Sequence, residues 1–378
     1  MDRLVIDFAD EGSVLLLNPR LPAAERARLE RIRDAVSPLR AHVWVTSSGS
    51  TGSLKLVALS KDAILASARA VNRHLDAKRS DVWCAPLPEF HVGGIGIHAR
   101  AFLTGSRVER LEGWSAMQFA LLVRETGVTL SALVPAQLTD LVERRLEASP
   151  SIRAIVIGGG RASDDLLAAA RDLGWPALPS YGMTECCSQI ATAPLGSLGQ
   201  DGPFELQVLP HLEVRIENDR LAIRGESLFS GYGIETGEGA RFVDPKIDGW
   251  FLSEDRAQLK VIEGSTFLEP GGRSSEFFKI GGESVSLARL DEILTKILDR
   301  FQNTDAAVFA VEDERLGHVI HLAVSDQSRA QAVFEAFSSA VLPFERPRAI
   351  HITEIPRSAL GKIQRGELAL RVGPSPSS

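Results

Sequence analysis

The chain has 378 residues, of which 44% are hydrophobic and 24% are charged, a composition typical of a soluble globular protein of about two or three domains. Its formal net charge is −7, which argues against a nucleic-acid partner, because binding to a phosphate backbone normally needs a basic patch. No apolar run approaches the roughly 20 residues of a membrane-spanning helix, so we expect no membrane span.

The cysteines and the first residues indicate a compartment. Cys84, Cys186 and Cys187 are the only cysteines, and their spacing fits neither a disulfide framework nor a metal site. The chain begins MDRLVIDFADEG, which is acidic where a signal peptide would be basic and then hydrophobic. We therefore expect a cytoplasmic protein that is neither exported nor anchored.

Patterns of strands and helices predict a mainly parallel sheet with helices on its faces. Near the start, Val14 to Asn18 is typical of a short strand and Pro22 to Ala35 of an amphipathic helix. Further elements are predicted as strands at 82–87, 107–111, 129–134 and 152–157, and as helices at 61–75, 115–125, 135–147 and 163–173.

The segment from Thr46 to Lys55, TSSGSTGSLK, has the composition of an anion-binding loop. It follows a run of β-forming residues, His42 to Val45, and precedes a helix that we expect to begin near Ser60, a good N-cap residue. Hydroxyls, glycines and one lysine can surround phosphate groups. A flexible surface connection is the alternative, and the loop lacks the Gly-Lys-Ser/Thr ending of a Walker motif.

Glycines follow two of the predicted strands, where ligands of parallel sheets bind. Gly93 and Gly94 come two and three residues after His91, and Gly158 to Gly160 follow the strand that ends at Ile157. Glycines let a substrate or a flat ring approach the backbone. Ordinary tight turns remain the alternative at both places.

The segment PSYGMTECCSQ, from Pro179 to Gln189, combines an aromatic ring, a hydroxyl and a carboxylate. The ring of Tyr181 can stack on a purine, the hydroxyl of Thr184 can bind an α-phosphate, and the carboxylate of Glu185 can hold Mg²⁺. Taken alone, the segment also fits a simple turn.

Beyond Glu205 the pattern changes, first to short strands at 205–209, 212–217 and 220–224. We expect these to form a distorted antiparallel barrel or a small sheet. Past a boundary near residue 274, a small α+β domain is predicted from helices at 287–300 and 327–341 and strands at 305–311, 318–324 and 347–353.

These segments resemble, in order, the motifs of the adenylate-forming superfamily, which contains acyl-CoA synthetases, luciferases and peptide-synthetase adenylation domains. The loop at 46–55 is similar to the phosphate loop, with Leu54 in place of the usual proline, and 181–185 matches the Tyr-Gly-Met-Thr-Glu motif. The segment from Arg224 to Tyr232 resembles an Arg-Gly…Gly-Tyr segment, to which we assign a structural role.

Three later segments carry the same resemblance. GWFLSED, ending at Asp255, is similar to Gly-Trp-Phe-x-Thr-Gly-Asp, in which the aspartate at the end of a strand binds the ribose. The segment 272–283 resembles the hinge, with Ser275 at the usual pivot position. PRSALGKIQR resembles the Pro-Arg-Thr-x-x-Gly-Lys-x-x-Arg signature, and its lysine is Lys362.

The resemblance implies a fold. We expect a large α/β N-terminal adenylation domain over residues 1–273, with mainly parallel sheets and a small distorted β-barrel, and a small α+β C-terminal mobile lid domain over 274–378. Members of the family usually have a longer segment before the phosphate loop, so a shortened N-terminal subdomain is implied.

The resemblance also implies site residues. The catalytic residues would be Lys362, Thr184, Glu185 and His91, with Glu185 as the metal ligand. The ATP-binding residues would be Thr46, Ser47, Ser48, Gly49, Ser50, Thr51, Gly52, Lys55, Gly158, Gly159, Tyr181, Asp255 and Arg273. The acyl substrate would contact His91, Gly93, Gly94, Ser180 and Gly182, and CoA would contact Gly281 and Gly282.

The implied activity is an ATP- and Mg²⁺-dependent ligase that adenylates a small carboxylic acid and transfers its acyl group to CoA. Residues 183–189, MTECCSQ, look most like the o-succinylbenzoate–CoA ligases of menaquinone biosynthesis. Arg100, Arg161 and His98 are candidates by position for binding the second carboxylate of that substrate, and each also fits a structural role. The alternatives are another acyl- or aryl-CoA synthetase, a carrier-protein-loading enzyme, or a non-catalytic adenylate-binding regulator, and a homo-oligomer is among the states that the sequence allows.

Overall fold

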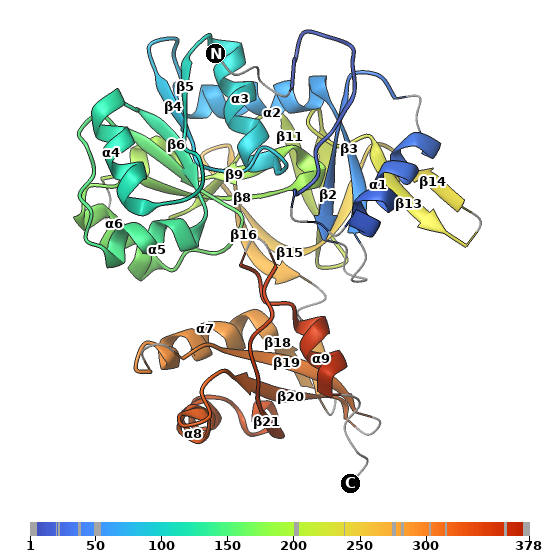
Figure 1. Cartoon of the computed structure of the whole chain (residues 1–378), viewed down its shortest axis with the longest axis vertical. Helices are drawn as coiled ribbons and strands as arrows, with labels where there is room; N and C mark the ends of the chain where they lie inside the picture. The colour runs from blue at the N-terminus through green and yellow to red at the C-terminus, as the bar shows by residue number, and fades with distance from the viewer. Residues whose placement is uncertain are drawn as a thin grey trace. The chain divides into compact units, whose positions relative to one another are not determined.

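A computed structural model describes residues 6–19, 21, 23–36, 39–48, 54–199, 204–237, 239–273, 277–280, 283–301, 304–313, 316–358 and 361–372. The chain forms two compact units (Figure 1). The first contains Met1–Ser253 and Ala257–Gly271, and the second contains Glu254–Arg256 and Gly272–Ser378. The domain boundary at 273 and the mobility of the second unit stay predictions.

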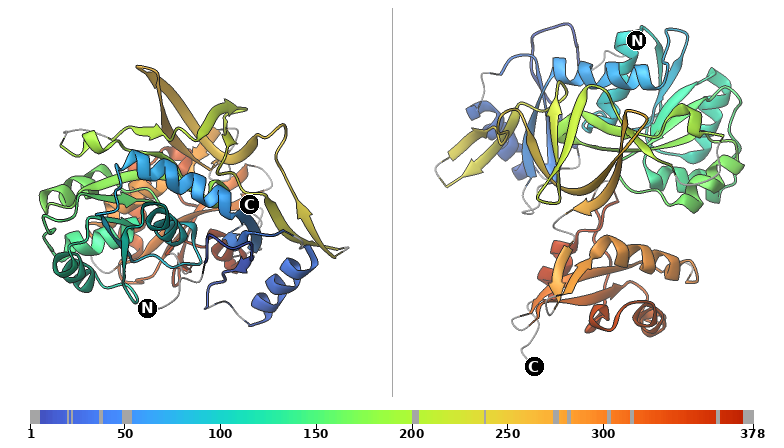
Figure 2. Two further views of the ribbon diagram at one scale, coloured as in Figure 1. Left: turned by 90° about the horizontal axis from the view of Figure 1, so that it is seen from above. Right: turned by 180° about the vertical axis from the view of Figure 1, so that it is seen from behind.

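The larger sheet of the first unit has 11 strands in the order β11-β12-β15-β16-β10-β9-β8-β7-β6-β4-β5. Its strands β4 (Val82–Ala85), β5 (Arg107–Arg110), β6 (Leu130–Leu133), β7 (Ala154–Ile157) and β8 (Ala177–Met183) are parallel, as predicted. All residues of β6 and β7 are buried, because helices cover both faces of this part of the sheet (Figure 2).

Two groups of helices cover these faces. On one face lie α4 (Ala116–Thr126), α5 (Pro135–Glu143) and α6 (Asp164–Asp172), which bury side chains such as Phe119, Leu138 and Leu167. On the other lie α2 (Lys61–His74) and α3 (Val92–Thr104), which bury Val71 and Ile97. No helix was predicted at α3, which makes it the main omission in this half of the unit.

The predicted barrel is wrong. The remaining strands are β9 (Ser188–Thr192), β10 (Leu206–Val208), β11 (Leu212–Glu217), β12 (Arg220–Gly225), β15 (Phe251–Ile262) and β16 (Ser265–Arg273). Because β10 pairs antiparallel with both β9 and β16, these strands extend the large sheet. That sheet runs as an open path from β11 to β5.

A second sheet of five strands, in the order β1-β2-β3-β13-β14, carries the predicted phosphate loop. Its strands are β1 (Val14–Leu15), β2 (His42–Ser48), β3 (Leu54–Ser60), β13 (Gly231–Thr236) and β14 (Gly239–Val243). Helix α1 (Ala23–Val36) packs against one face through Leu29 and Ile32, which contact Trp44 and Leu56.

The loop lies between two strands and not, as predicted, between a strand and a helix. Strands β2 and β3 form an antiparallel hairpin in which Ser47 is opposite Lys55. Helix α2 starts only after β3, at the predicted N-cap: Ser60 Oγ accepts a hydrogen bond from Ala63 N at 3.1 Å.

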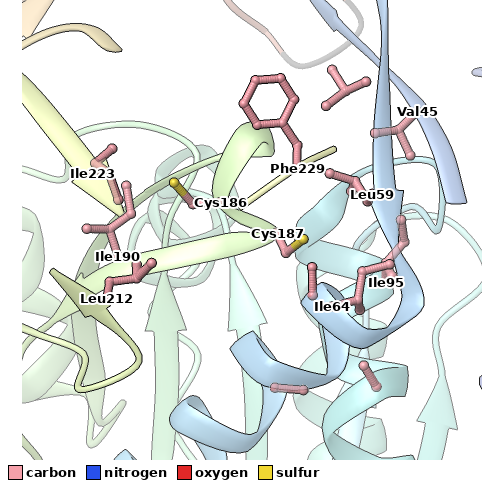
Figure 3. Close-up of a cluster of buried hydrophobic side chains, with 14 of the residues drawn as sticks. Val45, Leu59, Ile64, Ile95, Cys186, Cys187, Ile190, Leu212, Ile223 and Phe229 are labelled. Carbon is pink, nitrogen blue, oxygen red and sulfur yellow. The ribbon is translucent and has the colours of Figure 1, made fainter. Parts of the chain in front are cut away.

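A buried cluster connects this hairpin to the segment that contains Glu185 (Figure 3). Val45, Leu59 and Ile95 belong to it, and so do Cys186 and Cys187, which lie behind the motif. Burial raises the pKa of the Cys187 thiol far above its usual range. The two thiols therefore act as small apolar side chains, as expected for buried cysteines outside a reactive environment.

The second unit has the predicted α+β elements and, in addition, β17, β18 and α9, which were not predicted. Its sheet has the order β18-β17-β20-β19, with β21 paired to β20. The strands are β17 (Phe277–Ile280), β18 (Glu283–Ser286), β19 (Ala306–Asp313), β20 (Gly317–Val324) and β21 (Ala349–Ile352), and the helices are α7 (Leu287–Leu298), α8 (Ala330–Ala340) and α9 (Arg365–Val372). Among the described residues of the whole chain, no helix is long and apolar enough to cross a membrane.

Candidate active site

Three side chains from distant parts of the sequence meet beside the phosphate-loop hairpin. Tyr232 Oη donates a hydrogen bond to Glu185 Oε1 at 2.9 Å. Lys55 Nζ lies 5.4 Å from the centroid of the Tyr232 ring, within the range of a cation–π contact. Lys55, the lysine of the phosphate loop, and Glu185, the proposed metal ligand, thus both contact the side chain of Tyr232.

The backbone explains how Glu185 reaches this place. A β-bulge interrupts the pairing of β8 with β9 between Tyr181 and Gly182, and a Cβ on Gly182 would lie 1.8 Å from Ser188 O. Only glycine fits so close an approach. The next residues, Thr184–Cys186, form a short 3₁₀ turn, and Phe229 N donates to Glu185 O at 2.8 Å. The backbone of Glu185 therefore lies within this turn and is hydrogen-bonded to Phe229 through its carbonyl.

The predicted glycines that follow β7 lie next to Ser180, in the middle of β8. Ile157 pairs with Pro179 across these parallel strands, and Ser180 Oγ donates to Ile157 O at 3.0 Å. A Cβ on Gly158 would lie 3.1 Å from that hydroxyl, and Gly159 has a φ of +76°. The local backbone therefore explains why both positions are glycine, and their contact with ATP stays a prediction.

His91 and its glycines lie at the start of α3. His91 is the N-cap residue, and its ring centroid lies 4.5 Å from that of Phe90. A Cβ on Gly94 would lie 2.2 Å from Pro88 O, whereas one on Gly93 would lie 3.0 Å from Leu87 Cδ1. These glycines let the first turn of α3 pack on the preceding segment, and their role toward an acyl substrate stays a prediction.

The three residues predicted as candidates for binding the second carboxylate of the substrate differ in their exposure and in their acidic partners. Arg161 is exposed. His98 Nε2 lies 2.9 Å from Glu89 Oε1, and this contact helps to hold the pKa of Glu89 below its usual range. His98 is thus already matched with an acid, whereas Arg100 is not.

Arg100 is buried without an acidic partner. Its Nη2 donates to Gln189 Oε1 at 3.0 Å, and its guanidinium lies 5.5 Å from the centroid of the Trp83 ring. Within the described part of the chain, its Nε and Nη1 have no hydrogen-bond partner and no carboxylate pairs with it. Burial lowers its pKa to about 10, so the side chain stays charged at neutral pH. An unmatched buried charge of this kind is costly and points to an anionic ligand.

The remaining predicted residues fall in three groups. Gly49, Ser50, Thr51, Gly52, Ser275, Gly281 and Gly282 lie outside the described residues, and only the backbone of Ser48 and Arg273 is described. Thr46 and Ser47 lie at the end of β2. Asp255 lies inside β15 and not at the end of a strand, because the strand continues to Ile262.

Lys362 lies in the second unit, in a loop held by backbone and side-chain contacts. Ser358 N donates to Lys362 O at 2.8 Å, and Arg357 Nη1 donates to Gly361 O at 2.9 Å. Arg357 also pairs with Asp305 through two hydrogen bonds, of 2.6 and 3.1 Å. The backbone of the exposed lysine is therefore hydrogen-bonded to Ser358 at both its N–H and its carbonyl.

Sequence reasoning missed Tyr232. We assigned its segment a structural role, although a tyrosine carries a hydroxyl that has to find a partner when partly buried. That was the available signal.

The residues present fit one Mg²⁺ ion held together with phosphate groups. No group of three or more His, Cys, Asp or Glu side chains in the described residues could hold a metal by itself. Mg²⁺ commonly uses one or two carboxylates and completes its shell with phosphate oxygens and water. Glu185, beside the phosphate-loop lysine, suits that arrangement.

Comparisons with known proteins agree with this geometry. The family model described as AMP-binding enzyme matches residues 5–233. The 2-succinylbenzoate–CoA ligase of Bacillus cytotoxicus is 29% identical over 352 residues, which cover 89% of this chain and 71% of that protein.

Two similar solved structures are of the o-succinylbenzoate CoA synthetase MenE from Bacillus subtilis, each 26% identical to this chain. The complex with the acyl-adenylate intermediate OSB-AMP has a TM-score of 0.74 and covers 86% of this chain and 68% of that one. The complex with ATP and magnesium ion has a TM-score of 0.73, with coverages of 86% and 69%. Since the family model spans more than half of the sequence, the chain belongs to the AMP-binding enzyme family.

Proposed function

We propose that the protein is an AMP-forming acid–thiol ligase that converts o-succinylbenzoate to o-succinylbenzoyl-CoA. The observation that carries the enzyme class is the meeting of Lys55 and Glu185 at Tyr232, because it joins a phosphate-binding cation to a metal-binding carboxylate. The relatives named above supply the substrate. We also propose that it works in the cytoplasm.

In the first half-reaction, a carboxylate oxygen of the acid attacks the α-phosphorus of ATP, and pyrophosphate leaves as the P–O bond breaks. Lys55 and the hydroxyls of Thr46 and Ser47 would hold the β- and γ-phosphates, and Thr184 the α-phosphate. Bound Mg²⁺, held by Glu185, would neutralise charge on the phosphates. Lys362 would stabilise the charge that develops in the in-line transition state.

In the second half-reaction, the thiol of CoA attacks the carbonyl carbon of the acyl adenylate. The C–O bond to AMP breaks, AMP leaves as the anion, and the thiol proton passes to solvent. Gly281 and Gly282 would line the path of the thiol. Neither half-reaction needs an enzyme nucleophile, which agrees with the buried state of Cys186 and Cys187.

We infer that Arg100 binds the second carboxylate of the substrate. Its unmatched buried charge lies one hydrogen bond from Gln189, in the strand that follows the Glu185 turn. An acid that places a carboxylate against this guanidinium would supply the missing partner and could form a bidentate pair.

The test is release of pyrophosphate from ATP and Mg²⁺ with o-succinylbenzoate, with and without CoA, for the wild type and Lys362→Ala. We expect release that depends on this acid and collapses in the variant. Release with another acid only would redirect the substrate proposal and leave the enzyme class standing. ATP binding without release for any acid would instead support a regulator.

A further inference from the structure

Tyr232 contacts both charged groups of the candidate nucleotide site. Its hydroxyl donates to Glu185 Oε1 at 2.9 Å, and its ring lies 5.4 Å from Lys55 Nζ. Within the described residues no ion pair joins Lys55 directly to Glu185. The Tyr232 side chain is therefore a contact that the two opposite charges share.

We propose that Tyr232 is a positioning residue for metal-bound nucleotide: it orients the Glu185 carboxylate for Mg²⁺ and keeps the Lys55 ammonium beside it. This inference rests on the proposed function, since it assumes that the site takes ATP with a divalent cation. It assigns a role in that site to a residue outside the matched phosphate and metal motifs.

The hydroxyl restricts the carboxylate to one orientation. The backbone of Glu185 is fixed by its 3₁₀ turn and by the hydrogen bond from Phe229 N. Tyr232 then fixes Oε1, which leaves Oε2 for a cation. A carboxylate ligand that is already oriented loses less side-chain entropy when the metal binds, which is why hydrogen-bond partners of ligands tune metal affinity.

Pairing with two neighbouring strands holds the backbone of Tyr232 in place. Tyr232 lies between Val57 of β3 and Val243 of β14 in the sheet. Just before it, Ser230 N donates to Ala58 O at 2.8 Å, and Lys246 Nζ donates to Phe229 O at 2.7 Å. The phenol is therefore placed by the same hairpin that carries the phosphate loop.

A packing role is the competing explanation, because the Tyr232 ring also contacts Phe229 with centroids 4.7 Å apart. The Tyr232→Phe substitution separates the two, since it keeps the ring and removes only the hydroxyl. Thr236→Val is a matched control: it removes a hydroxyl from the same strand, where Thr236 Oγ1 donates to the backbone at Gly239 O at 2.8 Å.

The experiment measures binding without turnover. Free Mn²⁺ is followed by electron paramagnetic resonance while protein is added in the presence of α,β-methylene-ATP, and nucleotide binding is measured separately without metal. For Tyr232→Phe we expect Mn²⁺ to bind about tenfold more weakly, with metal-free nucleotide binding and melting temperature close to those of the wild type. Thr236→Val should match the wild type in all three.

A double-mutant cycle tests whether Tyr232 affects metal binding through the Glu185 carboxylate. If Tyr232 acts through that carboxylate, Tyr232→Phe should add no further loss to Glu185→Gln. Equal Mn²⁺ binding by wild type and Tyr232→Phe, a loss that also appears without metal, or additive losses in the cycle would each overturn the proposal alone. A wild type without any metal-dependent nucleotide binding would overturn both the proposal and the proposed function.

Discussion

At the residue scale, Arg100 is the buried charge that we propose binds the second carboxylate. It is 2% exposed and makes one side-chain hydrogen bond, to Gln189, within the described part of the chain. Burying a charge without an opposite charge destabilises a folded protein, and groups perturbed in this way are concentrated at functional sites.

Arg100→Met should therefore stabilise the free protein and disable recognition of the second carboxylate. Replacing buried ionic groups by apolar ones of similar size is neutral or stabilising by about 1–4 kcal/mol, whereas kcat/KM for o-succinylbenzoate should fall by about 100-fold through the lost charge pair. Urea unfolding and steady-state kinetics measure the two effects.

The control is a substrate that lacks the ring carboxylate, 4-oxo-4-phenylbutanoate. Its turnover should be low in the wild type and should change little in Arg100→Met, because it offers the guanidinium nothing to bind. A parallel loss for both acids would mean that Arg100 shapes the site without contacting the second carboxylate.

At the scale of elements, the first turn of α3 depends on one glycine. A Cβ on Gly94 would meet the backbone of Pro88 at 2.2 Å, whereas one on Gly93 would meet the end of the Leu87 side chain at 3.0 Å. Gly94→Ala should cost about 1–3 kcal/mol of unfolding free energy, since backbone has to move, and Gly93→Ala clearly less. Urea denaturation tests this, and equal stabilities together with a higher KM for the acid in Gly94→Ala would favour the substrate role.

The loop that carries Lys362 depends in turn on Arg357. This guanidinium joins Asp305, just before β19, to Gly361 O, next to the lysine. For Arg357→Ala we expect acid-dependent pyrophosphate release to fall by about 10–100-fold, because a misplaced catalytic group loses its geometric advantage. Thioester formation from purified acyl adenylate and CoA should stay near wild type.

Arg371→Ala is the control for Arg357. It removes an exposed pair with Glu367 on α9 and two longer hydrogen bonds, to Thr353 Oγ1 and Glu354 O, and should leave both half-reactions unchanged. Equal losses in both half-reactions for Arg357→Ala would indicate a general weakening of the second unit.

At the scale of the whole molecule, the sequence predicted the elements whose local residue pattern determines their structure. Ser60 was predicted as a cap and is one, and the buried strands around Ile155 stand out by their apolar runs. Strand β3, Leu54–Ser60, was missed because its first two residues were assigned to the phosphate loop and its last residue directly precedes a helix. Pairing between distant residues explains two further differences. The strands predicted as a barrel pair with the large sheet. Tyr232 meets Glu185, 47 residues away, and although its hydroxyl indicates a partner, the local sequence does not identify which one.

The second unit contains a histidine pair that links its stability to pH. His351 Nε2 lies 3.0 Å from His321 Nδ1. Burial and, to a lesser extent, the neighbouring His351 lower the pKa of His321 to about 4, and burial also lowers the pKa of His351. The folded unit therefore favours two neutral rings. Their stabilising effect is complete above the unfolded pKa near 6.5 and is lost as the pH falls from there toward about 4.

We expect the second unit to lose about 1–2 kcal/mol of unfolding free energy between pH 7 and pH 4.5 through this pair, the partial exposure of His351 reducing the effect. Hydrogen exchange at a series of pH values, read from amides of β20 and β21, would report it. In His351→Gln the slope should shrink, because the remaining ring has a neutral partner that can hydrogen-bond either form. An unchanged slope in that variant would place the acid sensitivity in other groups.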